Sequence, residues 1–227
     1  FISNGFYADF ITTLVKTDNG LTILVIDGET EGLHRSKLRK MGWHSSDTAE
    51  IHFDNVRVPK DRLIGQEGMG FYYIVDSFQL ERLAGGLLSV GAMEAILETT
   101  LRYMQEREAF GRPIGRFQAL RHRIADLATE VEACRQLVHH TAWLYENGEF
   151  AVKECSMCKL HAAELQKKVV DECLQFFGGY GYMEEYPIAR AYRDTRVGTI
   201  AGGTSEIMRE IIAKMVIDDV QYQAAYK

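Results

Sequence analysis

Three short stretches of the sequence carry side chains able to do chemistry, and the first combines two thiols with an imidazole. Cys155, Cys158 and His161 recur at intervals of three residues, which places them within about one face of a helix. A structural zinc ion needs four ligands, and no second Cys or His pair stands at a suitable spacing. We therefore expect buried core thiols here, with no metal bound.

The second stretch is Glu81-Arg82, which falls inside an expected helix. A glutamate in a helix is most often a solvated surface residue. Gly85 and Gly86 follow one turn later, however, and a glycine inside a helix costs about 1 kcal/mol relative to alanine. A flat ligand lying against the backbone beside Glu81 would account for that cost.

The third stretch is the turn Ala201-Gly202-Gly203 and the helix start Thr204-Ser205-Glu206. Thr204 or Ser205 can cap the helix, and Glu206 stands in its first turn, where negative charge is favourable. The turn has the composition of a ligand-binding turn, yet it holds no acid, base or nucleophile before Glu206. A residue elsewhere in the chain must supply that group.

Arg107 stands before a turn that ends a long helical stretch, and it has two interpretations. Its positive charge can interact favourably with the negative end of the helix dipole, or its planar guanidinium group can bind a pyrophosphate. Both remain open from the residues alone.

Two kinds of pattern meet near residue 68 and predict the elements that position these residues. The stretches 8–17 and 21–29 flank an Asn19-Gly20 hairpin signal, and 51–59 alternates apolar and polar residues, so residues 1–68 predict an antiparallel β module. Residues 69–227 predict an antiparallel helical bundle, and the fold class is α+β, predominantly α. The expected helices cover residues 71–107, 117–147, 150–177, a short segment from Pro187, and 205–220.

Composition excludes several function classes. The chain has 227 residues and a net charge of -6, which argues against nucleic acid as the main partner. No apolar run is long enough to cross a bilayer, so we expect no membrane association and a targeting signal that is absent or removed. Four cysteines in helical segments are expected to be reduced, which fits a bacterial cytoplasm or a mitochondrial matrix.

At this point the residues resemble a known family, the acyl-CoA dehydrogenases, along essentially the whole chain. The runs that carry the resemblance are GWHSSDTAEIHFDNVRVP (42–59), QLERL (79–83), REAFGRPIGRFQ (107–118), QFFGGYGYMEEYPIARAYRD (175–194) and GGTSEIMRE (202–210). The run 175–194 fills every position of the family's C-terminal signature. The resemblance implies that residues 1–68 are part of a β-sheet, barrel-like middle domain, and that residues 69–227 are the C-terminal bundle domain. The N-terminal helical domain and an earlier flavin-binding segment have no counterpart in this chain.

The resemblance also implies a reaction, the α,β-dehydrogenation of acyl-CoA thioesters with FAD. Many members carry their catalytic base, a glutamate, in the position of Gly202. The isovaleryl-CoA and long-chain branches lack it there and place the base in the motif that matches Gln79–Arg82, which identifies Glu81. The remaining roles implied by resemblance are FAD contacts from Phe1, Ile2, Ser3, Arg107, Phe110, Gln118, Gln175, Gly178, Gly179, Thr204, Ser205 and Glu206, and substrate contacts from Gln79, Arg82, Gly202 and Gly203.

Partners and alternatives follow from the same resemblance. An electron-transferring flavoprotein is the expected electron acceptor, and a homo-oligomer, a dimer or tetramer, is expected because the family's arginine and glycine loop reach the flavin of a neighbouring subunit. Two other functions stay open: an acyl-CoA oxidase, and a non-catalytic fragment whose bundle serves oligomerisation. The preferred length and branching of the acyl chain is not readable from these residues.

Overall fold

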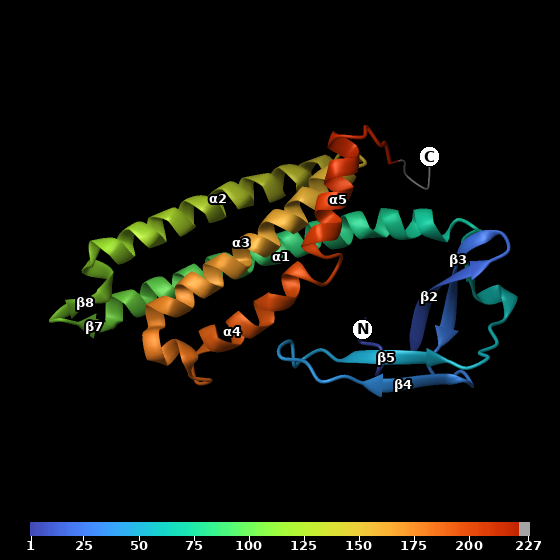
Figure 1. The fold of residues 1–227 in the computed structure, drawn as a ribbon, viewed down its shortest axis with the longest axis horizontal. Coiled ribbons are helices and arrows are strands. Elements are labelled where there is room, and N and C mark those ends of the chain that lie inside the picture. The colour runs from blue at the N-terminus through green and yellow to red at the C-terminus, as the bar shows by residue number, and fades with distance from the viewer. Residues whose placement is uncertain (223–227) are drawn as a thin grey trace. The chain divides into compact units, whose positions relative to one another are not determined.

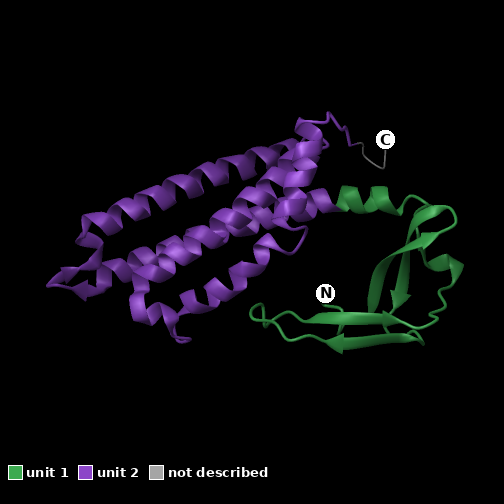
Figure 2. Cartoon of the chain, in the orientation of Figure 1, with its two compact units in different colours: residues 1–77, 224–227 green, residues 78–223 purple. Residues whose placement is uncertain are grey.

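The computed structural model describes residues 1–222. These residues fall into two compact units, one formed by Phe1–Ser77 and one formed by the residues from Phe78 onward (Figure 2). The predominantly helical α+β class expected from the sequence is confirmed (Figure 1). The domain boundary at residue 68, which was placed where the strand pattern gives way to the helical pattern, stays a prediction. Over residues 1–222, no helix combines the length and the hydropathy needed to cross a bilayer.

The first unit contains two small antiparallel sheets. Strands β2 (Phe10–Thr17) and β3 (Gly20–Asp27) form the expected hairpin, and the short β6 (Leu63–Ile64) adds to β3. Exposed and partly buried residues alternate along β2, as expected for a strand with one covered face. The second sheet has the order β1 (Ile2–Ser3), β5 (Thr48–Phe53), β4 (Leu33–Lys37).

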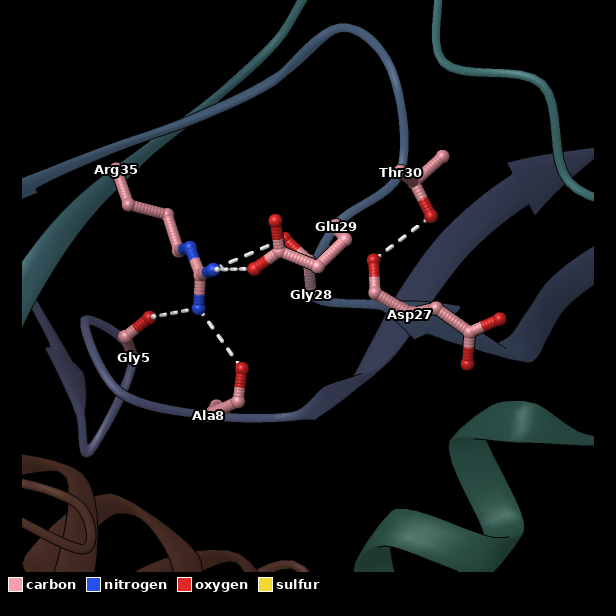
Figure 3. Close-up of polar contacts among 7 residues, drawn as sticks. All are labelled: Gly5, Ala8, Asp27, Gly28, Glu29, Thr30 and Arg35. Atoms are coloured by element: carbon pink, nitrogen blue, oxygen red, sulfur yellow. Dashed lines mark hydrogen bonds and ion pairs between the residues drawn. The ribbon is translucent and has the colours of Figure 1, made fainter.

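One arginine ties the loops of this unit together. The side chain of Arg35, on β4, donates hydrogen bonds to the backbone carbonyl oxygens of Gly5 at 3.4 Å, Ala8 at 2.8 Å and Gly28 at 2.9 Å (Figure 3). It also lies 3.5 Å from a carboxylate oxygen of Glu29, whose side chain is fully exposed. A planar guanidinium with five donors is suited to bind several carbonyls at once. Arg35 therefore fixes the chain segment that directly follows β1.

The second unit is a bundle of long helices. It contains most of α1 (Gly70–Glu106), α2 (Gln118–Glu146), α3 (Val152–Phe177), α4 (Pro187–Thr195) and α5 (Ser205–Val216). Helix α3 packs against α2, α4 and α5 (Figure 1). A short hairpin of β7 (Glu108–Ala109) and β8 (Arg112–Pro113) joins α1 to α2. All five expected helices are confirmed.

The last helix is shorter than expected. The sequence predicted a helix to residue 220, whereas α5 ends at Val216. Val216 is 63% and Ile217 77% exposed, so packing against the described residues does not extend the helix, and Asp219 adopts a left-handed backbone with φ 52°. Aspartates at a helix C-terminus also oppose its dipole.

The core of the bundle is apolar and contains the thiols. Four cysteines are free and buried, which confirms the expectation of reduced core thiols. Burial raises the pKa of Cys155 to about 12 and that of Cys134 to about 11, so both are neutral near pH 7. The core comprises residues from α1, α2 and α3, among them Met93, Val138, Cys155, Cys158 and Val169.

Candidate active site

The α1 helix carries Glu81 on an exposed face. Glu81 is exposed, and Leu88, two turns further on, is 75% exposed. Leu80, next to Glu81, is 53% exposed, so this face of α1 is open within the second unit. The assignment of Glu81 as a base stays a prediction.

The two glycines after Glu81 have different explanations. A Cβ atom on Gly86 would lie 3.4 Å from Cys158 Cβ and 3.4 Å from Val138 Cγ2, so Gly86 allows α1 to approach α2 and α3 closely. For Gly86 the ligand interpretation is therefore corrected to helix packing. A Cβ atom on Gly85 would meet no heavy atom within 4 Å, so this glycine faces open space beside Glu81. The ligand interpretation remains for Gly85 alone.

Arg82 points the other way, into the bundle. The residue is 8% exposed, and its guanidinium carbon lies 5.5 Å from the centre of the Phe78 ring. Its buried Nε atom has no hydrogen-bond partner among residues 1–222. Burial lowers the pKa of Arg82, although an arginine stays charged at any physiological pH. Gln79 is likewise buried, at 2% exposure, so the two predicted substrate contacts on α1 lie beneath the surface that Glu81 faces.

The turn before α5 is built from glycines in left-handed conformations. Gly202 has a φ of 65° and Gly203 a φ of 97°, which other residues adopt only with strain. A Cβ atom on Gly203 would come within 2.7 Å of Met208 Cε, whereas one on Gly202 would face open space. The predicted role of Gly202 requires such room.

The start of α5 matches the expected cap. Thr204 is the N-cap residue, and its side-chain oxygen accepts a hydrogen bond from the backbone N–H of Ile207 at 3.3 Å. Hydrogen bonds from its own backbone N–H and from the Thr204 side chain lower the pKa of Glu206. Ser205 is 4% exposed, and its Oγ has no partner among the described residues. A cavity of about 400 Å³ is lined by Glu164, Lys167, Arg196, Thr199, Ile200, Thr204, Ser205 and Glu206.

A second cavity brings four predicted FAD contacts together. Arg107, Gln175, Gly178 and Gly179 all line a space of about 540 Å³, along with Tyr103, Ile114, Phe176, Phe177, Tyr180 and Met183. The guanidinium carbon of Arg107 lies 5.4 Å from the centre of the Tyr180 ring, a distance typical of a cation–π contact. Gly178 ends α3 with φ 57° and ψ -134°, a conformation restricted to glycine. Arg107 thus faces a pocket, which favours the ligand interpretation over a purely local helix-end role.

Two other predicted FAD contacts lie near this pocket in sequence but do not line it. Phe110 stands at the tip of the β7–β8 hairpin with φ 52° and is 96% exposed. Gln118 is the first residue of α2 and is exposed. An aromatic ring held in solvent by a tight two-residue turn is a feature that calls for a partner.

The remaining predicted FAD contacts belong to the first unit. Ile2 and Ser3 form β1, which pairs with Ala49 and Thr48 of β5, and Phe1 is fully exposed at the end of the strand. The predicted FAD contacts of Phe1, Ile2 and Ser3 stay predictions.

Sequence reasoning missed Lys159, a buried cation that contacts the turn before α5. Lys159 of α3 is 6% exposed, and its Nζ donates a hydrogen bond to the carbonyl oxygen of Gly203. A signal existed, because Lys159 lies one helical turn after Cys155 and one before Ala163, on the apolar face of α3. A lysine on that face is unusual.

The thiol and imidazole pattern of α3 does not converge. Cys155 and Cys158 are buried, whereas His161 is exposed. Cys158 Sγ instead lies 3.0 Å from Thr141 Oγ1 inside the core. Within residues 1–222, no group of three or more His, Cys, Asp or Glu side chains is placed to hold a metal ion.

The predicted FAD contacts of the bundle fall at two ends of it. Gln175 lines the pocket near the β7–β8 hairpin, whereas Thr204 begins α5 at the opposite end of α3 (Figure 1). Lys159 contacts the turn before α5, and the 16 residues from Lys159 to Gln175 span roughly 24 Å at 1.5 Å per residue. The two groups of predicted FAD contacts therefore lie on separate parts of the bundle.

Comparisons with known proteins agree on one family. A family model described as the acyl-CoA dehydrogenase C-terminal domain matches residues 68–217. The chain is similar to the mitochondrial long-chain specific acyl-CoA dehydrogenase of Mus musculus, with 38% identity over 227 residues that cover 96% of this chain and 53% of the relative. It is 39% identical over 198 residues to the mitochondrial short/branched chain specific acyl-CoA dehydrogenase of Bos taurus, covering 87% of this chain and 46% of the relative. The crystal structure of an acyl-CoA dehydrogenase from Geobacillus kaustophilus superposes with a TM-score of 0.92 at 40% identity, covering 95% of this chain and 59% of that one. The chain spans about half the length of the curated relatives that it matches.

Proposed function

The chain belongs to the acyl-CoA dehydrogenase family and corresponds to the C-terminal portion of its members, and on this premise we propose that the protein oxidises acyl-CoA thioesters with FAD as its cofactor. The observation that carries the proposal is the pocket in which Arg107, Gln175, Gly178 and Gly179 meet. Four residues assigned to the cofactor line one cavity, one from the motif 107–118 and three from the motif 175–194. A surface without a ligand role would give no reason for this convergence.

The residues of this chain fit an adenine dinucleotide such as FAD. Arg107 offers a planar fork for a pyrophosphate, and the described residues hold it through an aromatic ring rather than a carboxylate. Cβ atoms on Gly178 and Gly179 would meet nothing within 4 Å, so the backbone there is open to a close approach. At the other end of the bundle, Ser205 Oγ is buried and has no hydrogen-bond partner among residues 1–222, so it could donate a hydrogen bond to the cofactor or accept one from it.

In the proposed reaction Glu81 acts as the base. Its carboxylate would take the proton from the α carbon of the acyl group. FAD, when bound, would supply the redox chemistry that removes the β hydrogen as a hydride. The backbone N–H of Gly202 donates a hydrogen bond to the thioester oxygen, where negative charge develops as the proton leaves. Gly202 leaves space for substrate, while the buried Arg82 and Gln79 support α1 from beneath the face that carries Glu81.

The exposed face of α1 gives the substrate a binding surface. Leu80 is 53%, Leu87 42% and Leu88 75% exposed around Glu81 and Gly85. An acyl chain lying there would bury these leucines and exclude water from the Glu81 carboxylate. The dry environment that the reaction needs is thus supplied on binding rather than by the described residues.

We further propose that the protein works as a homo-oligomer with an electron-transferring flavoprotein as its electron acceptor. The separation of roughly 24 Å along α3 between the two groups of FAD contacts supports the first part. Each bundle would contact two FAD molecules, one with Thr204–Glu206 and one with Arg107 and the Gly178–Gly179 loop. The exposed Phe110 ring would then be covered by a neighbouring subunit or its cofactor.

A substitution of Glu81 tests the proposal. The protein is mixed with FAD and its visible spectrum is recorded. Octanoyl-CoA or palmitoyl-CoA is then added in the absence of oxygen. We expect flavin bleaching with the wild type and a loss of at least about 100-fold in rate with Glu81→Gln. Glu98→Gln is the matched control, because Glu98 is on the same helix, its side chain is 75% exposed and, among residues 1–222, it forms an ion pair with Arg102 alone.

Each alternative outcome has its own meaning. Full turnover by Glu81→Gln would reject Glu81 as the base. Turnover of the wild type in air with release of peroxide would indicate an acyl-CoA oxidase. A folded, colourless protein that ignores both FAD and acyl-CoA would indicate a non-catalytic fragment.

A further inference from the structure

The buried position of Lys159 is energetically unfavourable for a charged side chain. Its side chain enters the bundle from α3 at 6% exposure, and the only hydrogen bond it makes within residues 1–222 goes to the Gly203 carbonyl oxygen. No carboxylate of the described residues lies within ion-pair distance of it. A buried ammonium loses its hydration, and a single neutral carbonyl does not restore it.

The surroundings add to this cost. Burial lowers the pKa of Lys159, and the positive charge of Arg82 lowers it further. Glu164 and Glu206 act in the opposite direction without contacting it. A methionine of similar length would fill this space without the charge, so packing alone does not explain a lysine here.

The contact explains what Lys159 does for the chain. Gly202 and Gly203 have no side chains, so the turn cannot anchor itself on the bundle through side-chain packing. Backbone freedom is largest at such residues. Lys159 reaches from the first third of the buried face of α3 and holds the turn by the carbonyl group of Gly203.

We propose that Lys159 is a positioning residue that fixes the Gly202–Gly203 turn and thereby aims the Gly202 backbone N–H. The claim that this N–H serves the thioester oxygen rests on the proposed function, whereas the anchoring of the turn does not. Arg82 is a second buried cation, and its positive charge acts on Lys159.

The first arm of the test measures the turn without any ligand. The protein is labelled with ¹⁵N-glycine, and backbone order parameters are measured for Gly202 and Gly203. We expect values of about 0.85 in the wild type and below about 0.6 in Lys159→Met. Lys159→Arg should keep the turn ordered, because it retains a donor, and Lys168→Met is the control on the exposed side of the same helix.

The second arm measures turnover of acyl-CoA by the FAD-loaded protein. We expect Lys159→Met to lower kcat about 100-fold, the effect of a reacting group misplaced by roughly 1 Å, with KM changed less than about twofold. Lys159→Arg should recover most of the rate. Thermal melting of each variant shows whether it is folded.

The two arms separate the two claims. Unchanged glycine order parameters in Lys159→Met would overturn the anchoring role, whatever the activity. A disordered turn with an unchanged kcat would overturn the catalytic consequence. A wild type that does not turn over acyl-CoA would refute the proposed function, while the order parameters would still decide whether Lys159 holds the turn.

Discussion

Gly85 offers the sharpest test of where a ligand lies on α1. The structure shows no heavy atom within 4 Å of a Cβ built on Gly85, so Gly85→Ala meets no clash in the chain itself. Alanine in a helix interior is about 1 kcal/mol more favourable than glycine. For a unit of about 150 residues this gain raises the Tm by roughly 3 °C. The substitution should therefore stabilise the protein.

If acyl-CoA or flavin lies against Gly85, the same methyl group must harm binding or turnover. It projects from the face that carries Glu81, so it would displace a ligand by about 1 Å and lower kcat/KM by roughly 10- to 100-fold. Stability and activity would then change in opposite directions. That combination is not expected from a surface glycine without a ligand.

Two other glycines of α1 are matched controls. A Cβ on Gly91 also meets nothing within 4 Å, so Gly91→Ala should give the same rise in Tm with full activity. A Cβ on Gly86 would touch Cys158 and Val138 at 3.4 Å, so the gain there should be offset by crowding. Thermal melts and steady-state rates on the three variants decide the matter. Equal activity in Gly85→Ala and Gly91→Ala would refute the ligand interpretation of Gly85, and no rise in Tm would refute the packing argument.

Three further predictions concern stability. Burial raises the pKa of Cys155 from 9.0 to about 12 in the folded state, so the stability that this thiol contributes is present below pH 9 and is lost as pH rises towards 12. Between pH 9 and 10.5 the free energy of unfolding of the wild type should fall by about 2 kcal/mol through this thiol. In urea titrations, Cys155→Ala should lack this part of the pH dependence. Thr204→Ala removes the cap of α5 and should cost about 1 kcal/mol by the same titration, and an unchanged midpoint would show that the hydrogen bond to Ile207 is not formed in solution. Arg35→Leu leaves the carbonyls of Gly5, Ala8 and Gly28 without their donor and should cost about 3 kcal/mol, whereas Glu29→Ala should change little because its side chain is fully exposed.

The helices were predictable because their signals are local. Apolar residues recur at helical spacing, and Gly148, Gly178 and Pro187 mark where helices end or begin. The strands were harder. Strand β4 (Leu33–Lys37) contains His, Arg, Ser and Lys in five residues, and only its pairing with β5 makes it a strand.

Site residues were predictable where a local motif determines the backbone conformation. They were not predictable where contacts between helices distant in sequence determine a residue's role. The Thr204 cap and the Gly178 helix end follow from residue type and were found. Gly86 was assigned to a ligand because a sequence does not say that α2 and α3 lie against that side of α1. Lys159 stands on the apolar face of α3, but its partner is a backbone carbonyl 44 residues away, and no residue type in the sequence marks that contact.

Helix α3 sets the distance and the relative rotation between the two groups of predicted FAD contacts. One residue inserted between Lys159 and Gln175 would lengthen it by about 1.5 Å and turn one end by about 100° relative to the other. The glycine turn and the arginine pocket would then no longer face the directions that two shared cofactors require. Insertions and deletions should consequently be tolerated in the loop around Gly148, which lies outside α3, and should abolish function between Lys159 and Gln175.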